Sequence, residues 1–216
     1  MSEICGQLHQ LFNGLTQHRF PFDASAIPQN GLYILFETGE AAHGGKRIVR
    51  VGTHTGTNQL RSRLNQHFVQ ENKDRSIFRK NIGRALLARD GDPFIEQWEI
   101  DLTTRIAKQA HAAGIDFARQ SEVERQVTKY IQQNFSFAVF CVNDKDARLK
   151  WESRIISTVS GCSVCRPSGA WLGNYSPKEK IRQGGLWLVN ELNKEALSGE
   201  ELGILREIVR VNVWPV

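Results

Sequence analysis

The 216-residue sequence lacks any apolar run approaching the about 20 residues that a membrane-spanning helix requires. Its first residues, MSEICGQLHQLFNGL, have an early glutamate, no leading basic cluster and no small-residue cleavage site, so they do not resemble a secretory signal. Internal repeats and low-complexity linkers are also missing. We therefore expect a cytoplasmic protein without a membrane segment, and its length predicts a single domain over residues 1–216.

Cysteine is scarce, and the four residues are Cys5, Cys141, Cys162 and Cys165. In a reducing cytosol, free thiols are favoured over disulfides. Cys162 and Cys165 have the spacing of a zinc half-site, but a structural zinc ion needs four ligands and no second Cys or His pair stands near them in the sequence. We favour the interpretation that Cys162 and Cys165 are simply two small residues in a turn. The alternative is a zinc site that recruits Cys5 or Cys141 through space.

Acidic residues are few in one stretch of the chain, although the net charge of the whole is only +5. Between residues 61 and 89 the acidic residues are Glu71 and Asp74, against eight basic ones. Such a block is suited to neutralising phosphates, and a solvated helical face is an equally good interpretation. The candidates for nucleic-acid binding are Arg61, Lys73, Arg75, Arg79, Lys80 and Arg84.

Apolar periodicity and turn residues predict an α+β domain. Segments rich in aromatic and β-branched residues are the expected strands: residues 31–36, 46–53 and 135–143. The glycines between the first two, Gly39, Gly44 and Gly45, predict a hairpin with a long loop.

Helical spacing of apolar residues recurs along the chain. The expected helices are a short accessory helix within residues 1–20, followed by residues 57–68, 76–89, 119–133, 146–160 and 201–209. Thr57 or Asn58 is the candidate N-cap of the second of these helices. Residues 98–122 as a whole give no clear pattern.

Four side chains could together hydrolyse a phosphodiester. That reaction needs a group that activates water, a cation for the developing negative charge and usually a metal ion. Tyr33 is a candidate for the first role, the forked donors of Arg63 suit two phosphate oxygens, and Glu152 could hold a hard cation. His67 lies one helical turn after Arg63 and so shares its face. Taken singly, each has a structural alternative: a packed strand tyrosine, a surface ion pair, a solvated glutamate and a structural histidine.

The order of Gly-Leu-Tyr at 31–33, Val-Gly-Thr at 51–53, RSRLNQHF at 61–68 and LKWESR at 149–154 resembles the GIY-YIG nuclease superfamily. The resemblance implies a small three-stranded antiparallel sheet flanked by helices, with N- and C-terminal helical elaborations. It also implies a one-metal hydrolytic site, with Mg²⁺ or Mn²⁺ bound by Glu152, and DNA as the partner. The core would occupy about residues 30–175, and residues 176–216 a C-terminal extension. RSIFRKNIG, RPSGAWLG and QGGLW further resemble a bacterial branch of the superfamily.

One position departs from the family pattern. The second motif usually has a tyrosine where this chain has Arg50, ahead of Val51 and Gly52. Either Arg50 holds the scissile phosphate or favours the phenolate of Tyr33, or its side chain points elsewhere and His54 does the missing work. An asparagine that often follows the catalytic glutamate has Asn174 as its nearest candidate.

Two functions follow from this sequence. The first is a divalent-metal-dependent DNA endonuclease in which Tyr33 activates water, Arg63 stabilises the phosphorane and Glu152 binds the metal. The alternative, suggested by Arg50, is a catalytically inactive nucleic-acid-binding module derived from such a nuclease. A compact chain without a separate binding domain fits a restriction or defence nuclease best, and a homodimer is an open option.

Overall fold

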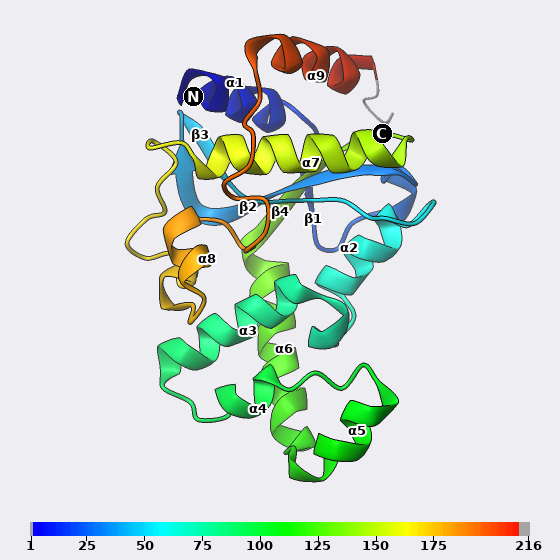
Figure 1. The fold of residues 1–216 in the computed structure, drawn as a ribbon, viewed down its shortest axis with the longest axis vertical. Helices are drawn as coiled ribbons and strands as arrows, with labels where there is room; N and C mark the ends of the chain where they lie inside the picture. Colours follow the sequence, from blue (N-terminus) through cyan, green and yellow to red (C-terminus); the bar gives the residue numbers. More distant parts are fainter. Residues whose placement is uncertain (1, 212–216) are drawn as a thin grey trace.

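The computed structural model describes residues 2–211 and places an antiparallel sheet at the centre of the molecule (Figure 1). The strands are β1 (His18–Arg19), β2 (Gly31–Ala42), β3 (Gly45–Gly52) and β4 (Phe135–Cys141), in the spatial order β1-β4-β2-β3. The predicted α+β class is confirmed, but the sheet has four strands rather than three. The additional strand, β1, pairs over two residues with the outer side of β4. Two residues are too few to show an alternating pattern, so the sequence could not reveal this strand.

Helices cover both faces of the sheet and extend the molecule downward (Figure 1). They are α1 (Ser2–Asn13), α2 (Leu60–Phe68), α3 (Ile77–Asp90), α4 (Ile95–Glu99), α5 (Arg105–His111), α6 (Phe117–Asn134), α7 (Lys145–Ser160), α8 (Glu179–Gly184) and α9 (Gly199–Val211). Short 3₁₀ turns lie at Ala24–Ala26, Lys73–Arg75, Ala112–Gly114 and Leu172–Tyr175. No helix between residues 2 and 211 is long and apolar enough to cross a membrane.

The central strand β2 is buried on both faces and so separates two apolar cores. Leu32 and Ile34 face the core formed with α1, α7 and α9, whereas Tyr33 and Leu35 face the core formed with α2, α3 and α6. This alternation is the two-residue period of a strand applied to a sheet with helices on both sides. The helix α1 contributes fully buried side chains to the first core, so it is a core element and not the expected accessory one.

The hairpin between β2 and β3 is tighter than predicted. Its turn consists of His43 and Gly44, which have positive φ angles of 51° and 76°. Two consecutive left-handed residues form the kind of two-residue turn that matches the twist of paired strands. Gly39 lies within β2 instead of in a loop, so the expected long loop is wrong.

The start of α2 also differs from the prediction. Gln59 precedes its first residue without a side-chain cap, and Asn58 has a left-handed backbone with φ of 58°. The Asn58 side-chain oxygen accepts a hydrogen bond at 2.8 Å from the Asn30 amide group, and the Asn58 backbone N–H donates to Asn30 Oδ1 at 2.7 Å. Asn58 therefore joins the 53–59 loop to the start of β2 instead of capping the helix.

The C-terminal segment is fastened to β2 through Glu37. Its Oε2 accepts hydrogen bonds from the indole N–H groups of Trp171 and Trp187, each at 2.8 Å. The Tyr130 hydroxyl of α6 donates to Oε1 of the same carboxylate. A buried carboxylate needs hydrogen-bond donors, and those of Glu37 come from α6 and from the C-terminal segment. The carboxylate therefore joins both of these segments to β2.

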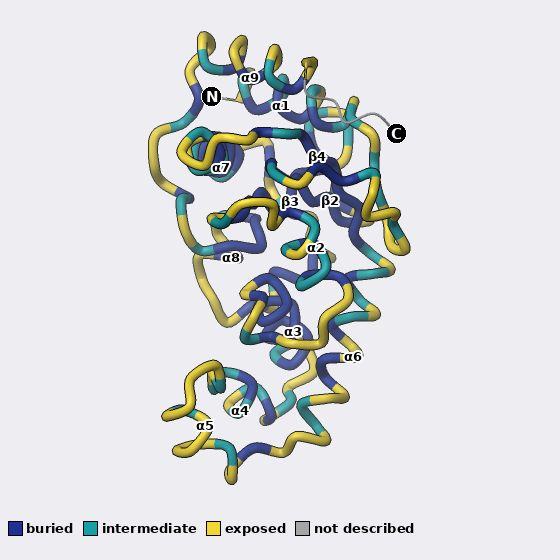
Figure 2. Tube along the Cα trace, turned by 90° about the vertical axis from the view of Figure 1, so that its right-hand side faces the viewer, coloured by how far each residue is buried: buried dark blue, intermediate teal, exposed yellow. Residues whose placement is uncertain are grey.

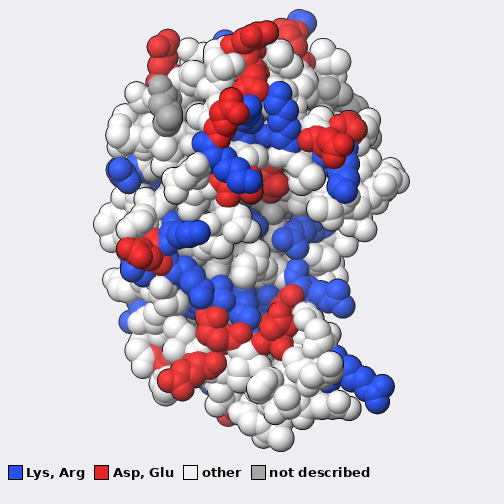
Figure 3. Space-filling view, in the orientation of Figure 1, with Lys and Arg blue, Asp and Glu red and all other residues white. Residues whose placement is uncertain are grey.

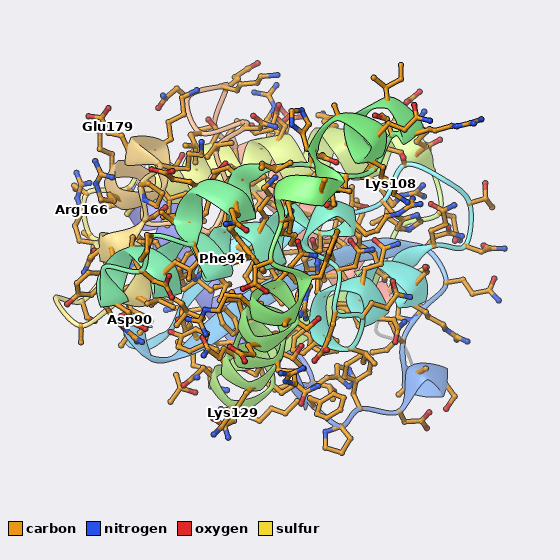
Figure 4. The ribbon with its side chains drawn as sticks, turned by 90° about the horizontal axis from the view of Figure 1, so that it is seen from below. Asp90, Phe94, Lys108, Lys129, Arg166 and Glu179 are labelled. Atoms are coloured by element: carbon orange, nitrogen blue, oxygen red, sulfur yellow. The ribbon has the colours of Figure 1, made fainter. Side chains whose placement is uncertain are left out.

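The lower end of the molecule, formed by α4 and α5, is mostly exposed (Figure 2). Viewed from below, Phe94 lies toward the middle of the molecule, whereas Lys129 of α6 lies at its margin (Figure 4). Phe94 and Trp98 belong to the core beneath the sheet, and Trp98 donates from its indole to the carbonyl of Lys80 at 3.0 Å. The segment that gave no clear sequence pattern begins in α4, which packs on α3, and continues through the exposed α5 into the start of α6.

Candidate active site

A cleft lies at the β3 edge of the sheet, between α7 above and α2 and α3 below, and Lys and Arg side chains gather around it (Figure 3). It consists of two adjoining hollows of ≈ 390 Å³ and ≈ 400 Å³ that share Leu149 and Glu152 of α7. The first hollow is completed by residues of α2 and of the 53–59 loop, and the second by Arg50, α3 and residues 188–191. Glu152 therefore stands where the two hollows meet.

Tyr33 reaches this edge because its neighbour on β3 is a glycine. Tyr33 pairs with Gly52, and a Cβ atom at position 52 would lie 2.2 Å from the Tyr33 hydroxyl oxygen. The phenol ring thus lies across the backbone of the outermost strand and carries its hydroxyl toward the edge. Position 52 must be glycine because the Tyr33 ring approaches its backbone too closely for a side chain.

The Tyr33 hydroxyl begins a hydrogen-bonded chain that runs to α3. Its oxygen is 2.8 Å from His67 Nε2, and His67 Nδ1 is 2.7 Å from the Ser76 hydroxyl. Ser76 also caps α3 by accepting from the Arg79 backbone N–H at 3.2 Å. His67 is completely buried, and this burial, with help from Arg63 and other arginines, lowers its pKa well below the usual value. A neutral imidazole donates from one nitrogen and accepts at the other, so His67 fixes the direction of the Tyr33 hydroxyl.

Arg50 lies between the phenol and the cleft. Its Nε is 3.4 Å from the Tyr33 oxygen, its NH1 group donates to the carbonyl of Trp187, and its guanidinium lies 5.3 Å from the centre of the Phe78 ring. The same side chain lines the second hollow together with Glu152. Of the two arrangements considered for this residue, the structure shows the one in which it adjoins Tyr33.

His54 has both ring nitrogens engaged by the backbone. Its Nε2 accepts from the Gly31 N–H at 3.3 Å, and its Nδ1 donates to the Gly56 carbonyl at 2.7 Å. Burial lowers the pKa of His54, which keeps the ring neutral and suits this pair of roles. The side chain lines the first hollow, where it holds the 53–59 loop in place.

Glu152 comes from a helix on the opposite face of the sheet from the Tyr33 ring, yet both reach the same edge. The backbone N–H of Thr53, just beyond β3, donates to Glu152 Oε1 at 3.1 Å. Burial raises the pKa of the Glu152 carboxyl, and the charge of Arg50, the Thr53 amide and the charge of Arg63 oppose that rise. The acid is thus held between two guanidinium groups at the outermost strand.

Arg63 faces Glu152 across the first hollow. Its NH1 group donates to Gln66 Oε1 and to the Arg75 carbonyl, each at 3.1 Å. These bonds set the guanidinium at the junction of α2 and the turn before α3. A phosphate in the first hollow would meet this forked donor on one side and the carboxylate on the other.

Asn81 is a cleft residue that sequence reasoning missed. It lies on α3, is completely buried and lines the second hollow with Arg50 and Glu152. Its Oδ1 accepts from Arg84 at 2.6 Å, while its Nδ2 has no hydrogen-bond partner within residues 2–211. An unpaired buried donor is costly, so this amide group is poised to bind a ligand oxygen. No sequence signal marked it, because an isolated asparagine on a helix has no distinctive spacing.

Asn174, the sequence candidate for the asparagine position, does not line either hollow. Its side-chain amide donates to the carbonyls of Ser168 and Gly169 at 2.9 Å and 3.2 Å. It therefore closes the turn before Trp171 and lies outside the cleft, whereas Asn81 of α3 lines the second hollow.

Four of the six basic residues expected to contact nucleic acid are buried. Arg79 is fully enclosed and forms an ion pair with Glu124 at 2.6 Å, and Arg84 binds Glu99 with two of its nitrogens. The ammonium groups of Lys73 and Lys80 donate to backbone carbonyls at the end of α4. These four are structural, because a buried and paired cation cannot neutralise a phosphate without breaking its pair.

The other two basic residues, Arg61 and Arg75, are not fully enclosed, so nucleic-acid contact stays a prediction for them. Arg75 is exposed at the turn before α3. Arg61 is half-buried and donates to the carbonyl of Ile27 at 2.7 Å. Arg61 lies on the helix that carries Arg63, and Arg75 follows that helix, so of the six candidates these two are the ones left for a phosphate contact.

Comparison with protein-family models matches residues 3–213 to the GIY-YIG domain, so the chain belongs to the GIY-YIG family. Members of this family are generally endonucleases, which act on DNA and use divalent metal ions. No curated protein and no solved structure matches the chain.

The cleft fits a hard divalent cation through Glu152. Mg²⁺ keeps several of its water ligands and takes one or two carboxylates in addition to substrate phosphates, so it does not need a cage of acids. Glu152 places one carboxylate where the two hollows meet, which is compatible with such an ion when a substrate phosphate supplies further ligands.

Proposed function

We propose that this protein is a divalent-metal-dependent DNA endonuclease whose active site is the cleft at the β3 edge. The observation that carries the proposal is the meeting of Glu152, Arg50 and Arg63 around one pair of hollows, with the Tyr33–His67 pair directly behind Arg50. Carboxylate, forked cations and a held phenol are the groups that phosphodiester hydrolysis requires.

Each side chain has a separate task in this proposal. Arg63 donates to the non-bridging oxygens of the scissile phosphate, where charge accumulates in the transition state. Tyr33, in its phenolate form, accepts the proton of the attacking water and becomes a neutral phenol. Arg50 stabilises the negative charge of the phenolate and that of the phosphate. A Mg²⁺ or Mn²⁺ ion held by Glu152 supplies Lewis-acid stabilisation of the phosphate and the leaving oxygen.

His67 acts as a positioning residue. Its lowered pKa keeps the ring neutral, so it does not compete with Tyr33 for the proton of the attacking water near neutral pH. Its hydrogen bond holds the phenol oxygen in one place, and Ser76 holds the ring from the other side. Asn81 adds a donor for a substrate oxygen in the second hollow.

Plasmid cleavage tests the proposal directly. Supercoiled DNA is incubated with the protein and Mg²⁺ or Mn²⁺, and nicked and linear products are measured. Glu152→Ala and Arg63→Ala should each abolish cleavage while leaving the circular dichroism spectrum unchanged. The matched control is Glu191→Ala, which removes another carboxylate lining the second hollow and should retain cleavage. If the wild-type protein cleaves no form of DNA with either ion, the endonuclease proposal fails.

A second function is favoured by one observation. Tyr33 is only 1% exposed, and Arg50 stands between it and the cleft. This arrangement would suit a catalytically inactive protein that uses the same fold only to bind DNA. That reading predicts salt-sensitive DNA affinity without turnover, and affinity unchanged by Glu152→Ala. Metal-dependent strand breaks by the wild-type protein would eliminate it.

A further inference from the structure

A cluster of sulfur and nitrogen ligands lies in the core on the α1 side of the sheet, apart from the cleft. It brings together residues from three parts of the chain: Cys5 and His9 of α1, His43 of the β2–β3 turn, and Cys162 and Cys165 of the loop after α7. The cysteines are buried and His43 is half-buried. Cys141, the other sequence candidate, is outside the cluster and points its thiol to Asn143.

Two distances within the cluster fall in the range expected between ligands of one small metal ion. Cys5 Sγ lies 3.3 Å from Cys165 Sγ, and Cys162 Sγ lies 3.5 Å from His43 Nε2. The ligand atoms of Cys5, His9, His43 and Cys165 all lie within 4.8 Å of one another, and Cys162 adjoins this group through His43. A tetrahedral zinc ion, with bonds of about 2.3 Å to sulfur and 2.0 Å to nitrogen, separates its ligands by about 3.3–3.8 Å.

His9 is close to the thiols but is already committed to the backbone. Its Nδ1 is 2.9 Å from the Cys5 carbonyl, which can only accept, so Nδ1 carries the proton. Its Nε2 lone pair then accepts the backbone N–H of Ile48 at 3.2 Å. If Nε2 moved to a metal, that buried amide would lose its partner, at a cost of about 1–3 kcal/mol. His9 is therefore a neighbour of the cluster and not its fourth ligand.

His43 is presented to the thiols by two local features. The left-handed backbone of the turn, with φ of 51°, places its ring against α1. The residue beneath the ring is Gly6, where a Cβ atom would lie 3.1 Å from His43 Nδ1. The absence of a side chain at position 6 leaves space for the imidazole.

We propose that Cys5, His43, Cys162 and Cys165 bind one zinc ion, which ties the N-terminal helix and the β2–β3 turn to the loop after α7. Three cysteines and one histidine form a closed set of four ligands, as in structural zinc sites. The loop after α7, which the ion would hold, continues to Pro167 and then to Trp171, whose indole donates a hydrogen bond to Glu37. The ion stabilises the fold and takes no part in the cleft chemistry.

Metal analysis of the purified full-length chain tests the proposal without any activity assay. The protein is prepared under reducing conditions without added chelator, and its zinc and iron contents are measured by mass spectrometry. We expect one zinc per chain in the wild type and in the matched control Cys141→Ser, and loss of at least nine-tenths of it in Cys162→Ser and His43→Asn. Replacement of zinc by Co²⁺ should give the strong visible absorption of a tetrahedral thiolate site.

Chelation provides a measurement that does not depend on whether the variants fold. Removing the ion from the wild type should lower the unfolding temperature, and one equivalent of Zn²⁺ should restore it. Wild-type protein without zinc, or with iron in its place, overturns the proposal, as does a disulfide between Cys5 and Cys165 in the reduced preparation. Zinc kept by Cys162→Ser but lost from His9→Asn overturns the ligand set.

Discussion

The substitution Glu152→Gln separates the stability of the cleft from its proposed chemistry. Glutamine has nearly the same volume, and its Oε1 can still accept the Thr53 N–H that lies 3.1 Å from the carboxylate. The change removes a carboxyl whose pKa is raised chiefly by burial, in spite of two nearby arginines. A raised pKa means that the folded protein holds the proton more tightly than the unfolded chain, so the ionised group opposes folding.

The sign and the pH range of the effect follow from that shift. Below the unfolded value of about 4.5 the carboxyl is neutral in both states, and the substitution changes little. As pH rises through the raised folded pKa, the wild type pays an increasing penalty that the glutamine variant avoids. At neutral pH we expect the variant to be more stable by about 1 kcal/mol, as is common when a functional charge is removed. For a chain of this length, that corresponds to an unfolding temperature about 2–4 °C higher.

The assay is thermal unfolding at several pH values, with and without Mg²⁺. The ion should stabilise the wild type, by about 1.4 kcal/mol at ten times its dissociation constant, and should not stabilise Glu152→Gln. The control is Glu191→Gln in the same cleft, where a hydrogen bond from Ser153 lowers the carboxyl pKa, so the substitution should not stabilise the protein. A less stable Glu152→Gln variant at neutral pH, or one that gains as much from Mg²⁺ as the wild type, would refute the reasoning.

Three further substitutions test other contacts. Gly52→Ala places a Cβ atom 2.2 Å from the phenol oxygen that crosses it, so urea unfolding should show a loss of about 1–3 kcal/mol, whereas Gly203→Ala on the open side of α9 should show none. Glu124→Ala leaves the enclosed Arg79 without its partner and should cost about 3–5 kcal/mol by the same measurement; an unchanged midpoint would contradict the ion pair. Arg75→Ala should lower the slope of log affinity for duplex DNA against log salt by about 0.9, the value for one phosphate contact, and an unchanged slope would remove this residue from the interface.

Local patterns predicted most of the elements and failed where a contact joins distant residues. The helix around Glu152 has periodic apolar residues and was predicted near its observed bounds, whereas the strand around Tyr33 was predicted to end at residue 36 and continues to Ala42. The helix α3 was also predicted, but its basic side chains were expected to contact nucleic acid, and Arg79, Lys80 and Arg84 are buried instead. Arg79 pairs with Glu124, 45 residues away, and a spacing of that size leaves no periodic signal that a cation is buried.

In the cleft, too, some residues were predicted from the sequence, whereas contacts between distant residues were not. The resemblance to a family selected Tyr33, Arg63 and Glu152, and the structure brings Arg63 and Glu152 to one hollow. Composition and spacing alone could not place an acid from one face of the sheet beside a ring from the other, because that depends on where the outermost strand ends. Asn81 and the contact of Arg50 with Trp187 were not predicted for the same reason.

The bond between Arg50 and the Trp187 carbonyl makes the C-terminal extension part of the cleft. A shortened protein ending near residue 175 would keep every strand and the helix of Glu152, yet it would lose the carbonyl that fixes Arg50 and one of the two indoles that bond Glu37. Because residues 188–191 also line the second hollow, the smallest unit that can be fused or transplanted with its cleft intact extends through Glu191, well past the last strand of the sheet.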